Sequence, residues 1–456
     1  MIWDDALIAK YDLSGPRYTS YPTAPQFDVN IDKVALITNM MAPSRAPLSL
    51  YFHIPFCANL CYYCACNKIV TKQYDKGSDY VELLGEEMRL RSLMLDNRRE
   101  VTQLHFGGGT PTFLNTQHFR ILFAHLHDNF NLQQDGRQDF SIEIDPREID
   151  EDKLAELVSL GINRISLGVQ DFDPKVQQSI HRVQSYDLVK ALVNNARELG
   201  IQSINFDLIY GLPFQSVSGF KKTLDDVIRL SPDRISLFNY AHLPNRFRSQ
   251  KRLPEEHLPP AKEKLAILKM SINYLLDSGY EYIGMDHFAK PQDALTKARD
   301  AGLLHRNFQG YTTHSGTDLL AFGVSGISNI NGVYMQNLLE LNAYKESIEN
   351  GQLAIAKGYI SNNDDRIRHD VIMTLLSQFQ LSFDFIEKKH KIKFVEYFSD
   401  ELARLEPILA DNMVQYFSSQ GRNGIRVTER GRLLIRCVCM VFDKHLNSAI
   451  QYSKVI

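Results

Sequence analysis

The sequence has no long hydrophobic run and no excess of charge of either sign. No apolar stretch reaches the roughly 18 residues of a membrane span, and the best candidate, 433–442, contains Arg436. Lys and Arg number 51 against 54 Asp and Glu, so bulk charge gives no reason to expect a nucleic-acid partner. Residues 1–5 lack the basic start and the apolar stretch of a signal peptide. We therefore expect a cytoplasmic protein without a membrane span.

Internal repeats and low-complexity tracts are also missing from the 456 residues. At about 150 residues per domain, this length predicts two or three domains, or one large domain with an appendage. Apolar residues make up 44% and charged residues 23%, which are ordinary values for a globular protein with a sizeable core. Wholesale disorder is therefore excluded.

Short β-branched or aromatic runs alternate with segments of helical periodicity. One helix is predicted between Asp150, a candidate N-cap, and Gly161, a candidate C-cap; another ends at Gly200. Repeated strand–helix–strand units predict parallel strands with right-handed crossovers. Strands are predicted at 48–54, 101–106, 140–144, 164–169, 203–209, 234–238 and 280–284.

This number of units favours an α/β fold of the partial (β/α) barrel type. A doubly wound sheet is the alternative, but it would place a glycine-rich fingerprint directly after the first strand, where this sequence has cysteines. We predict an N-terminal arm or lid at 1–45, the barrel and its extension at 46–365, and a mostly helical domain at 366–456. Turn-forming residues at 15–23 predict an extended segment within the arm.

Four of the six cysteines lie within ten residues: Cys57, Cys61, Cys64 and Cys66. Clustered thiols in a cytosolic chain indicate metal or redox chemistry more often than disulfides. Zinc sites usually use two separated Cys-x-x-Cys pairs, and no second pair occurs here. Three thiolates at Cys-x3-Cys-x2-Cys spacing can instead reach three irons of a cubane cluster and leave the fourth open. A structural zinc site or a chance cluster of thiols is the alternative.

This loop resembles the radical S-adenosylmethionine (SAM) superfamily, whose motif is Cys-x3-Cys-x-φ-Cys with an aromatic φ, here Tyr63. The resemblance implies that Cys57, Cys61 and Cys64 ligate a [4Fe–4S] cluster whose open iron chelates SAM. It also implies reductive cleavage of SAM to a 5′-deoxyadenosyl radical.

Further polar or glycine-rich positions follow the predicted strands. Because strand ends share one rim of a (β/α) barrel, these residues are expected to meet at one site. They are the segment 107–112 (Gly-Gly-Gly-Thr-Pro-Thr), Glu143, Gln170, Asp207, and Asn239, Tyr240 and Ala241. Each of these residues alone would more often be a cap or turn residue. The prediction of a shared site rests on their joint placement after successive strands.

Several longer segments extend the resemblance over nearly the whole chain. They are 16–22 (Pro-Arg-Tyr-Thr-Ser-Tyr-Pro), 51–57 (Tyr-x-His-Ile-Pro-Phe-Cys), 107–112, 205–213 (Asn-x-Asp-Leu-Ile-Tyr-Gly-Leu-Pro), 284–289 (Gly-Met-Asp-His-Phe-Ala), 305–313 (His-Arg-Asn-Phe-Gln-Gly-Tyr-Thr-Thr) and 431–436 (Gly-Arg-Leu-Leu-Ile-Arg). With Cys66, they resemble the oxygen-independent coproporphyrinogen III oxidase family. The resemblance implies anaerobic oxidative decarboxylation of the ring A and B propionates of coproporphyrinogen III to vinyl groups. The product would be protoporphyrinogen IX, in heme biosynthesis.

The resemblance also implies two SAM molecules, a reductant such as flavodoxin or ferredoxin, an electron acceptor and a monomeric enzyme. By motif, the residues expected at the first SAM are Tyr51, Tyr63, Gly108, Glu143 and Ile327. Those expected at the second are Gly109, Thr110, Gln170, Arg182, Asp207 and Ala241. Tyr51 and the non-ligand cysteine Cys66 are the expected catalytic residues. Ala65 stands where the family commonly has glycine, which leaves the placement of Cys66 open.

Two further groups of residues invite hypotheses. A flexible tetracarboxylate substrate needs cations, and we regard Arg17 and Arg306 as candidate contacts. Cys437 and Cys439 lie on a predicted apolar helix, where buried inert thiols are expected. Two alternative functions stay open: a heme chaperone of the same fold, whose members typically lack Cys66 and the arm, and a radical SAM methyltransferase, for which only Cys66 could accept a methyl group.

Overall fold

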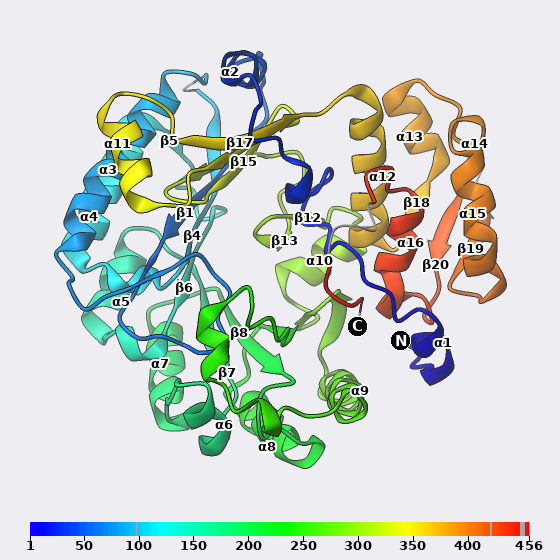
Figure 1. Cartoon of the computed structure of the whole chain (residues 1–456), viewed down its shortest axis with the longest axis horizontal. Coiled ribbons are helices and arrows are strands. Elements are labelled where there is room, and N and C mark those ends of the chain that lie inside the picture. Colours follow the sequence, from blue (N-terminus) through cyan, green and yellow to red (C-terminus); the bar gives the residue numbers. More distant parts are fainter. Residues whose placement is uncertain (97, 420–421, 447–451, 456) are drawn as a thin grey trace.

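The dominant feature of the computed structural model is an open, curved sheet whose central strands run parallel (Figure 1). The structure describes residues 1–456 except 97, 420–421, 447–451 and 456. The strand order is β10-β11-β9-β8-β7-β6-β4-β1-β14-β15-β16-β17. Its parallel strands are β1 (Leu48–Ile54), β4 (Glu100–Gly108), β6 (Asp139–Ile144), β7 (Arg164–Gln170), β8 (Ser203–Tyr210), β9 (Arg234–Asn239) and β14 (Asp318–Phe322). The partial barrel predicted from the alternating pattern is confirmed.

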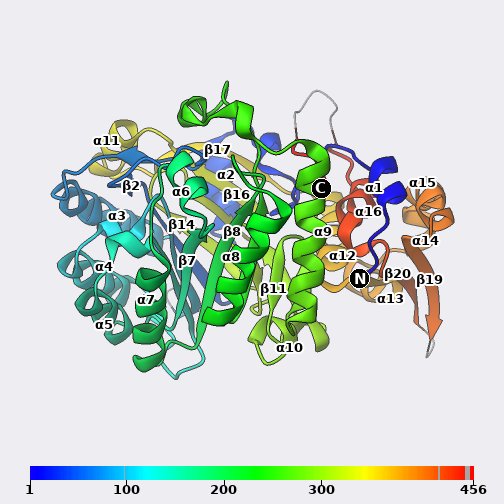
Figure 2. The same ribbon diagram turned by 90° about the horizontal axis from the view of Figure 1, so that it is seen from below.

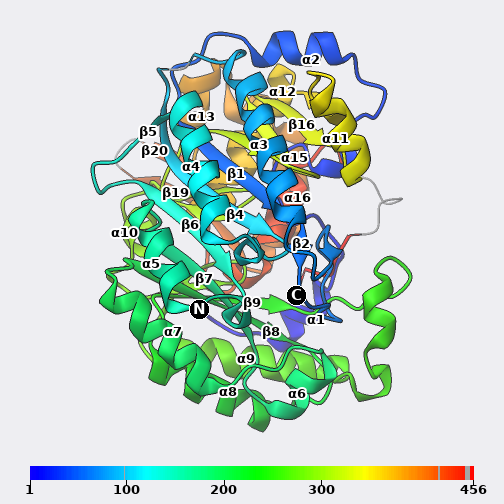
Figure 3. The same ribbon diagram turned by 90° about the vertical axis from the view of Figure 1, so that its left-hand side faces the viewer.

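Helices cover the outer face of this sheet (Figures 2 and 3). They are α3 (Lys76–Ser92), α4 (Thr116–Asn129), α5 (Glu151–Ser159), α6 (Pro174–Ser179), α7 (Tyr186–Glu198), α8 (Val217–Leu230) and α9 (Ala261–Asp277). The N-cap predicted for α5 is confirmed, because the Asp150 side chain accepts from the Lys153 backbone N–H. The C-cap is Leu160 rather than the predicted Gly161, which follows it with a φ of +101°.

Alternation along the strands divides apolar from polar side chains. In β6, Phe140, Ile142 and Ile144 are buried, whereas Ser141 and Glu143 line a cavity of about 300 Å³ in the barrel interior. Successive side chains of a strand point to opposite faces, so the apolar set packs under the outer helices and the polar set faces inward. The barrel therefore has a polar lumen.

An extension of mostly antiparallel strands continues both edges of the sheet. It comprises β10 (Glu281–Gly284), β11 (His287–Ala289), α10 (Ala294–Asp300), β12 (His305–Asn307), β13 (Gly310–Thr312), β15 (Ile327–Ile330), β16 (Val333–Asn337), α11 (Leu341–Glu349) and β17 (Ile355–Ile360). The hairpin of β12 and β13 lies beside the open side of the barrel (Figure 1).

The C-terminal part packs as a separate group of elements beside that open side (Figure 1). It comprises α12 (Asn363–Gln378), β18 (Gln380–Ser382), α13 (Phe383–His390), α14 (Phe394–Tyr397), α15 (Ser399–Ala410), β19 (Val414–Ser419), β20 (Arg422–Val427) and α16 (Ile435–Val441). The sequence predicts a mostly helical domain at 366–456; in the structure this part also contains β18 and β19, which pair with β20 as a small antiparallel sheet. The expected burial of Cys437 and Cys439 is confirmed.

The N-terminal arm contains α1 (Asp5–Lys10) and α2 (Lys33–Met40), with the extended segment 15–23 between them. Arg436 of α16 holds this segment to the end of the chain, because its guanidinium donates to the carbonyls of Gly15, Pro16 and Lys454. The two ends of the chain consequently lie close together (Figure 1). Among the described residues, no helix is both long and apolar enough to cross a membrane.

Candidate active site

The cysteine loop follows β1 and is fixed at both ends by backbone hydrogen bonds. β2 (Phe56–Cys57) pairs with β3 (Ile69–Val70), and the Thr71 N–H donates to the Cys57 carbonyl at 2.9 Å. Cys57 is buried, Cys61 and Cys64 are half-buried, and Cys66 is exposed. The short sheet therefore presents the four thiols on one loop at the rim of the barrel.

Each of the first three sulfurs lies near a hydrogen-bond donor. The Thr110 hydroxyl is 3.5 Å from Cys57 Sγ, and the Cys66 backbone N–H is 3.4 Å from Cys64 Sγ. Arg182 Nη1 lies 3.5 Å from Cys61 Sγ. Hydrogen bonding by Cys66, with the charge of Lys68 nearby, lowers the pKa of the Cys64 thiol to about 6. Donors and cations around the Cys64 sulfur thus favour its thiolate, the form that ligates metals. At Cys57, burial outweighs the Thr110 hydrogen bond and raises the pKa of the thiol to about 12.

This donor set fits an iron–sulfur cubane. No three Cys, His, Asp or Glu side chains within the described ranges are grouped as the ligands of a single metal ion. A cubane makes no such demand, because each thiolate ligates a different iron. The positive groups beside the sulfurs also suit a cluster that carries several thiolate charges.

The glycine segment after β4 packs directly on the cysteine loop. The Gly109 and Thr110 N–H groups donate to the carbonyls of Ile54 and Phe56, both at 2.8 Å. A Cβ on Gly109 would lie 2.7 Å from the Pro55 carbonyl oxygen, and Gly108 has a φ of +117°. Glycine is thus required here by close packing and by backbone conformation. The two loops form one platform.

Glu143 ends the inward-facing row of β6 beneath that platform. Its carboxylate accepts from the Gly108 N–H at 3.3 Å and lies 3.3 Å from His105 Nε2. The His105 ring stacks on Tyr51, with centroids 5.8 Å apart, and its Nδ1 lies 2.7 Å from the Ser141 hydroxyl. The Glu143 side chain is 44% exposed. It is therefore oriented by its neighbours and free to accept from a bound ammonium group.

Arg182 is buried beside the cysteine loop rather than lying free at the surface. Its Nη1 pairs with Asp145 at 2.8 Å, and its Nη2 donates to the Gly168 carbonyl at 2.7 Å. Arg147 also pairs with Asp145, at 2.7 Å. Burial opposes ionisation of Asp145, but the two guanidinium groups outweigh it and lower the pKa of that carboxyl to about 2. This ion network was missed in the sequence, although charged residues directly after a predicted strand could have indicated it.

Asp207 lies inside β8, three residues before its end, and faces the lumen. The sequence pattern had placed it at the strand terminus. It accepts from Ser166 Oγ and from Asn205 Nδ2, each at 2.8 Å. Burial, and then the charge of Glu143, raises the pKa of Asp207 to about 6. Asp207 and Glu143 line the same cavity.

The remaining predicted residues lie around this rim. Gln250 donates to the carbonyls of Tyr63 and Ala241, and thereby ties the cysteine loop to the end of β9. Gln170, at the end of β7, is buried with a φ of +65°, and its Oε1 has no hydrogen-bond partner among the described residues. Ile327 begins β15, on the other side of β1 from Glu143.

Comparison with known proteins agrees with this geometry. Residues 51–227, which contain the cysteine loop and most of the barrel, match the radical SAM superfamily. The oxygen-independent coproporphyrinogen III oxidase of Pseudomonas aeruginosa is 48% identical over 100% of this chain and 99% of its own. That of Escherichia coli is 47% identical over 100% and 98%. The chain belongs to the oxygen-independent coproporphyrinogen III oxidase family.

Structural similarity to this oxidase family is equally complete. The structure of the Escherichia coli radical SAM enzyme coproporphyrinogen III oxidase superposes with a TM-score of 0.92 at 45% identity, covering 98% of this chain and 99% of that one. Radical SAM enzymes use SAM and a [4Fe–4S] cluster, and the three-cysteine motif lies within the segment that matches the superfamily. The chain is thus a radical SAM enzyme of the oxidoreductase class.

Proposed function

We propose that this chain converts the ring A and B propionates of coproporphyrinogen III to vinyl groups, giving protoporphyrinogen IX. Full-length similarity to the oxidases of this name, together with the thiol loop above a polar lumen, carries the proposal. Each propionate loses one hydrogen atom, carbon dioxide and one electron, which passes to an external acceptor. When bound, a [4Fe–4S] cluster and SAM would supply the radical chemistry that removal of this hydrogen atom requires.

The residues of the thiol loop and its neighbours would hold these cofactors. Cys57, Cys61 and Cys64 would ligate the cluster, with the Arg182 guanidinium and the Thr110 hydroxyl donating to their sulfurs. Glu143 would accept from the SAM ammonium group, held in place by His105. Tyr51, Tyr63, Gly108 and Ile327 complete the proposed first SAM site.

A second SAM molecule is proposed on the neighbouring part of the rim. Gln170 offers an unpaired buried acceptor there, and Asp207 offers a carboxyl facing the lumen. Arg182 joins this site to the cysteine loop through Cys61, while Gly109, Thr110 and Ala241 contribute backbone or small side chains. Cys66, exposed beside Cys64, is proposed to act in turnover without ligating the cluster.

Anaerobic turnover tests the proposal. The reconstituted enzyme is given SAM, a strong reductant and coproporphyrinogen III, and the porphyrin products are followed by chromatography and mass spectrometry. We expect protoporphyrinogen to form through a mono-vinyl intermediate while SAM is consumed. Cys57→Ala should abolish both product formation and SAM consumption. SAM cleavage with intact substrate would refute the substrate assignment, and tight heme binding without SAM cleavage would favour the chaperone alternative.

A further inference from the structure

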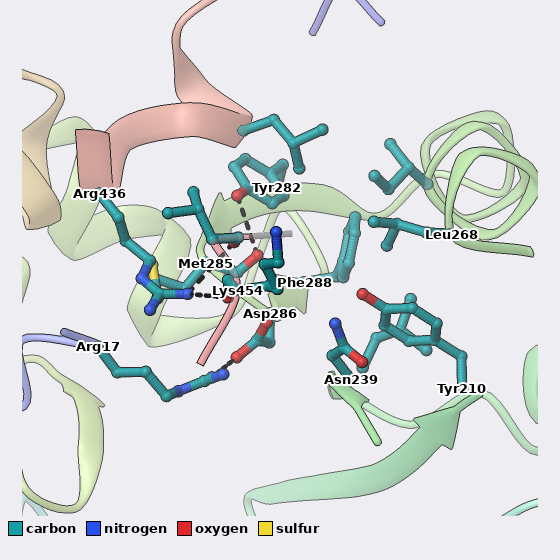
Figure 4. A pocket seen from close by; sticks show the side chains of 14 residues that line it. Arg17, Tyr210, Asn239, Leu268, Tyr282, Met285, Asp286, Phe288, Arg436 and Lys454 are labelled. Atoms are coloured by element: carbon teal, nitrogen blue, oxygen red, sulfur yellow. Dashed lines mark hydrogen bonds and ion pairs between the residues drawn. The ribbon is translucent and has the colours of Figure 1, made fainter. Parts of the chain in front are cut away.

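Beside the rim, a second pocket opens where the arm, the barrel and the C-terminal part meet. It is lined by Arg17 of the arm, Tyr210 and Asn239 at the ends of β8 and β9, Asp286 from the turn between β10 and β11, and Arg436 of α16. Figure 4 shows Arg17 and Asp286 pointing toward each other, with Tyr210 and Asn239 on the other side of the cavity. Ala241, proposed at the second SAM site, follows Asn239 by two residues.

Positive charge outweighs negative charge around this pocket. Arg17 pairs with Asp286, and the Arg17 side chain stays 36% exposed, so it can be reached from solution. Arg436 is only 2% exposed and donates to backbone carbonyls, which carry no formal charge. Among the described residues, the groups that Arg436 contacts therefore do not neutralise its positive charge.

Arg306 of β12 is the third guanidinium in this region. It is 4% exposed and packs on the Tyr311 ring at 4.7 Å, but its Nε and Nη1 have no hydrogen-bond partner among the described residues. Arg306 shares a cavity with Thr19, two residues from Arg17 on the arm. The same Tyr311 ring packs edge-on against His287, with centroids 5.3 Å apart, and His287 directly follows Asp286, the partner of Arg17. Arg306 is therefore linked through one ring to the Arg17–Asp286 pair.

A buried guanidinium with unused donors is costly unless an anion joins it. The nearby acidic side chains do not serve Arg306, since Asp300 pairs with Arg299 and Asp370 pairs with Lys389 and His390. A planar guanidinium recognises a carboxylate through two parallel hydrogen bonds. The unused donors therefore indicate a missing carboxylate ligand.

We propose that Arg306 and Arg17 bind a propionate of the porphyrinogen that does not react, and that Asp286 occupies Arg17 until the substrate arrives. The proposal rests on the proposed function. A propionate on ring C or D remains anionic throughout turnover, so fixed cations suit it. A reacting propionate loses its carboxylate group as neutral carbon dioxide and keeps its other two carbons as the vinyl group. An ion pair to that carboxylate would stabilise the substrate and oppose the reaction.

Equilibrium binding to the reconstituted enzyme tests this site. The probes are coproporphyrin III, which carries four propionates, and deuteroporphyrin IX, which keeps only those of rings C and D. Arg306→Gln should raise the Kd of both by about 10-fold or more, the loss expected when a charged hydrogen-bonding partner is removed. Arg17→Gln should act in the same direction. Arg404→Gln, which changes an exposed arginine on α15, is the control and should leave both values unchanged.

Thermal denaturation separates binding from a structural role. Because Arg306 is an unpaired buried charge, Arg306→Gln should leave the Tm unchanged or raised while affinity falls. Unchanged affinity in Arg306→Gln, or a Tm that falls in parallel with affinity in both Arg306→Gln and Arg306→Lys, would refute the site. Wild-type enzyme that binds neither probe would refute the proposed substrate as well, whereas wild-type binding unaffected by Arg306→Gln would refute only the carboxylate site.

Discussion

Asp207→Asn should stabilise the folded chain at neutral pH and abolish turnover. The Asp207 carboxyl has a pKa of about 6 in the folded protein against an ordinary value of 3.8, because burial, and then Glu143, disfavours its charge. An asparagine has no charge to bury. The asparagine can keep both hydrogen bonds of Asp207, because Asn205 can donate to the new side-chain carbonyl and the Ser166 hydroxyl can rotate to accept from the new side-chain amide.

The magnitude follows from proton linkage. Between pH 3.8 and about 6 the folded state binds more protons than the unfolded state, so the stability that neutral Asp207 contributes is lost as pH rises through this interval. A difference of about 2 pKa units corresponds to at most about 3 kcal/mol, the gain expected from Asn at pH 7.5. The gain should fall to about half near pH 5 and to about a fifth at pH 4. For a chain of this length, about 3 kcal/mol shifts the Tm by about 3 °C.

Thermal denaturation of the cluster-free protein at pH 7.5 and pH 5 measures this gain. Wild type, Asp207→Asn and the control Asp128→Asn, which changes an exposed aspartate on α4, are compared under identical conditions. The Asp128 variant should match wild type at both pH values. A Tm of Asp207→Asn below that of wild type at pH 7.5, or a gain that does not shrink at pH 5, would refute the reasoning.

Three further results are expected. Arg182→Ala leaves Asp145 buried with only Arg147 as partner, so thermal or urea denaturation should show a loss of about 3 kcal/mol; an unchanged midpoint would contradict the network. Gly109→Ala forces a Cβ against the Pro55 carbonyl, so the iron and sulfide content per chain should fall after reconstitution. The control Gly136→Ala places its Cβ in open space and should leave the iron and sulfide content unchanged, although Gly136 also has a positive φ. Cys439 is fully buried, so a thiol reagent should label it only after unfolding; early labelling would show that α16 opens.

The parallel strands could be predicted because they are buried on an apolar face and bounded by turn residues. The predicted strand 48–54 coincides with β1 (Leu48–Ile54), and the predicted strand 203–209 differs from β8 by one residue. Segment 285–365 could not be predicted, because its strands are short and pair at a distance. β14 (Asp318–Phe322) lies beside β1, some 270 residues earlier in the chain, and only the folded register shows that pairing.

The candidate site was predicted through the cysteine loop and the glycine segment, where spacing itself carries information. The unused donors of Arg306 could not be predicted, because they depend on which side chains are absent nearby. Asp207 shows the same limit. The sequence predicts Asp207 as a site residue. Its position within the lumen, and hence its raised pKa, follows from burial that no local sequence pattern encodes.

The contact between the two ends of the chain has a consequence for biosynthesis. The Gly15 N–H donates to the Ser453 carbonyl at 3.0 Å, and the Val455 N–H donates to the Leu13 carbonyl at 2.8 Å. During translation, residues 13–15 emerge more than four hundred residues before their partners at 453–455. Arg17 therefore reaches its final position only after residue 455 has been synthesised. A nascent chain can therefore complete its barrel while the pocket around Arg17 is still unfinished.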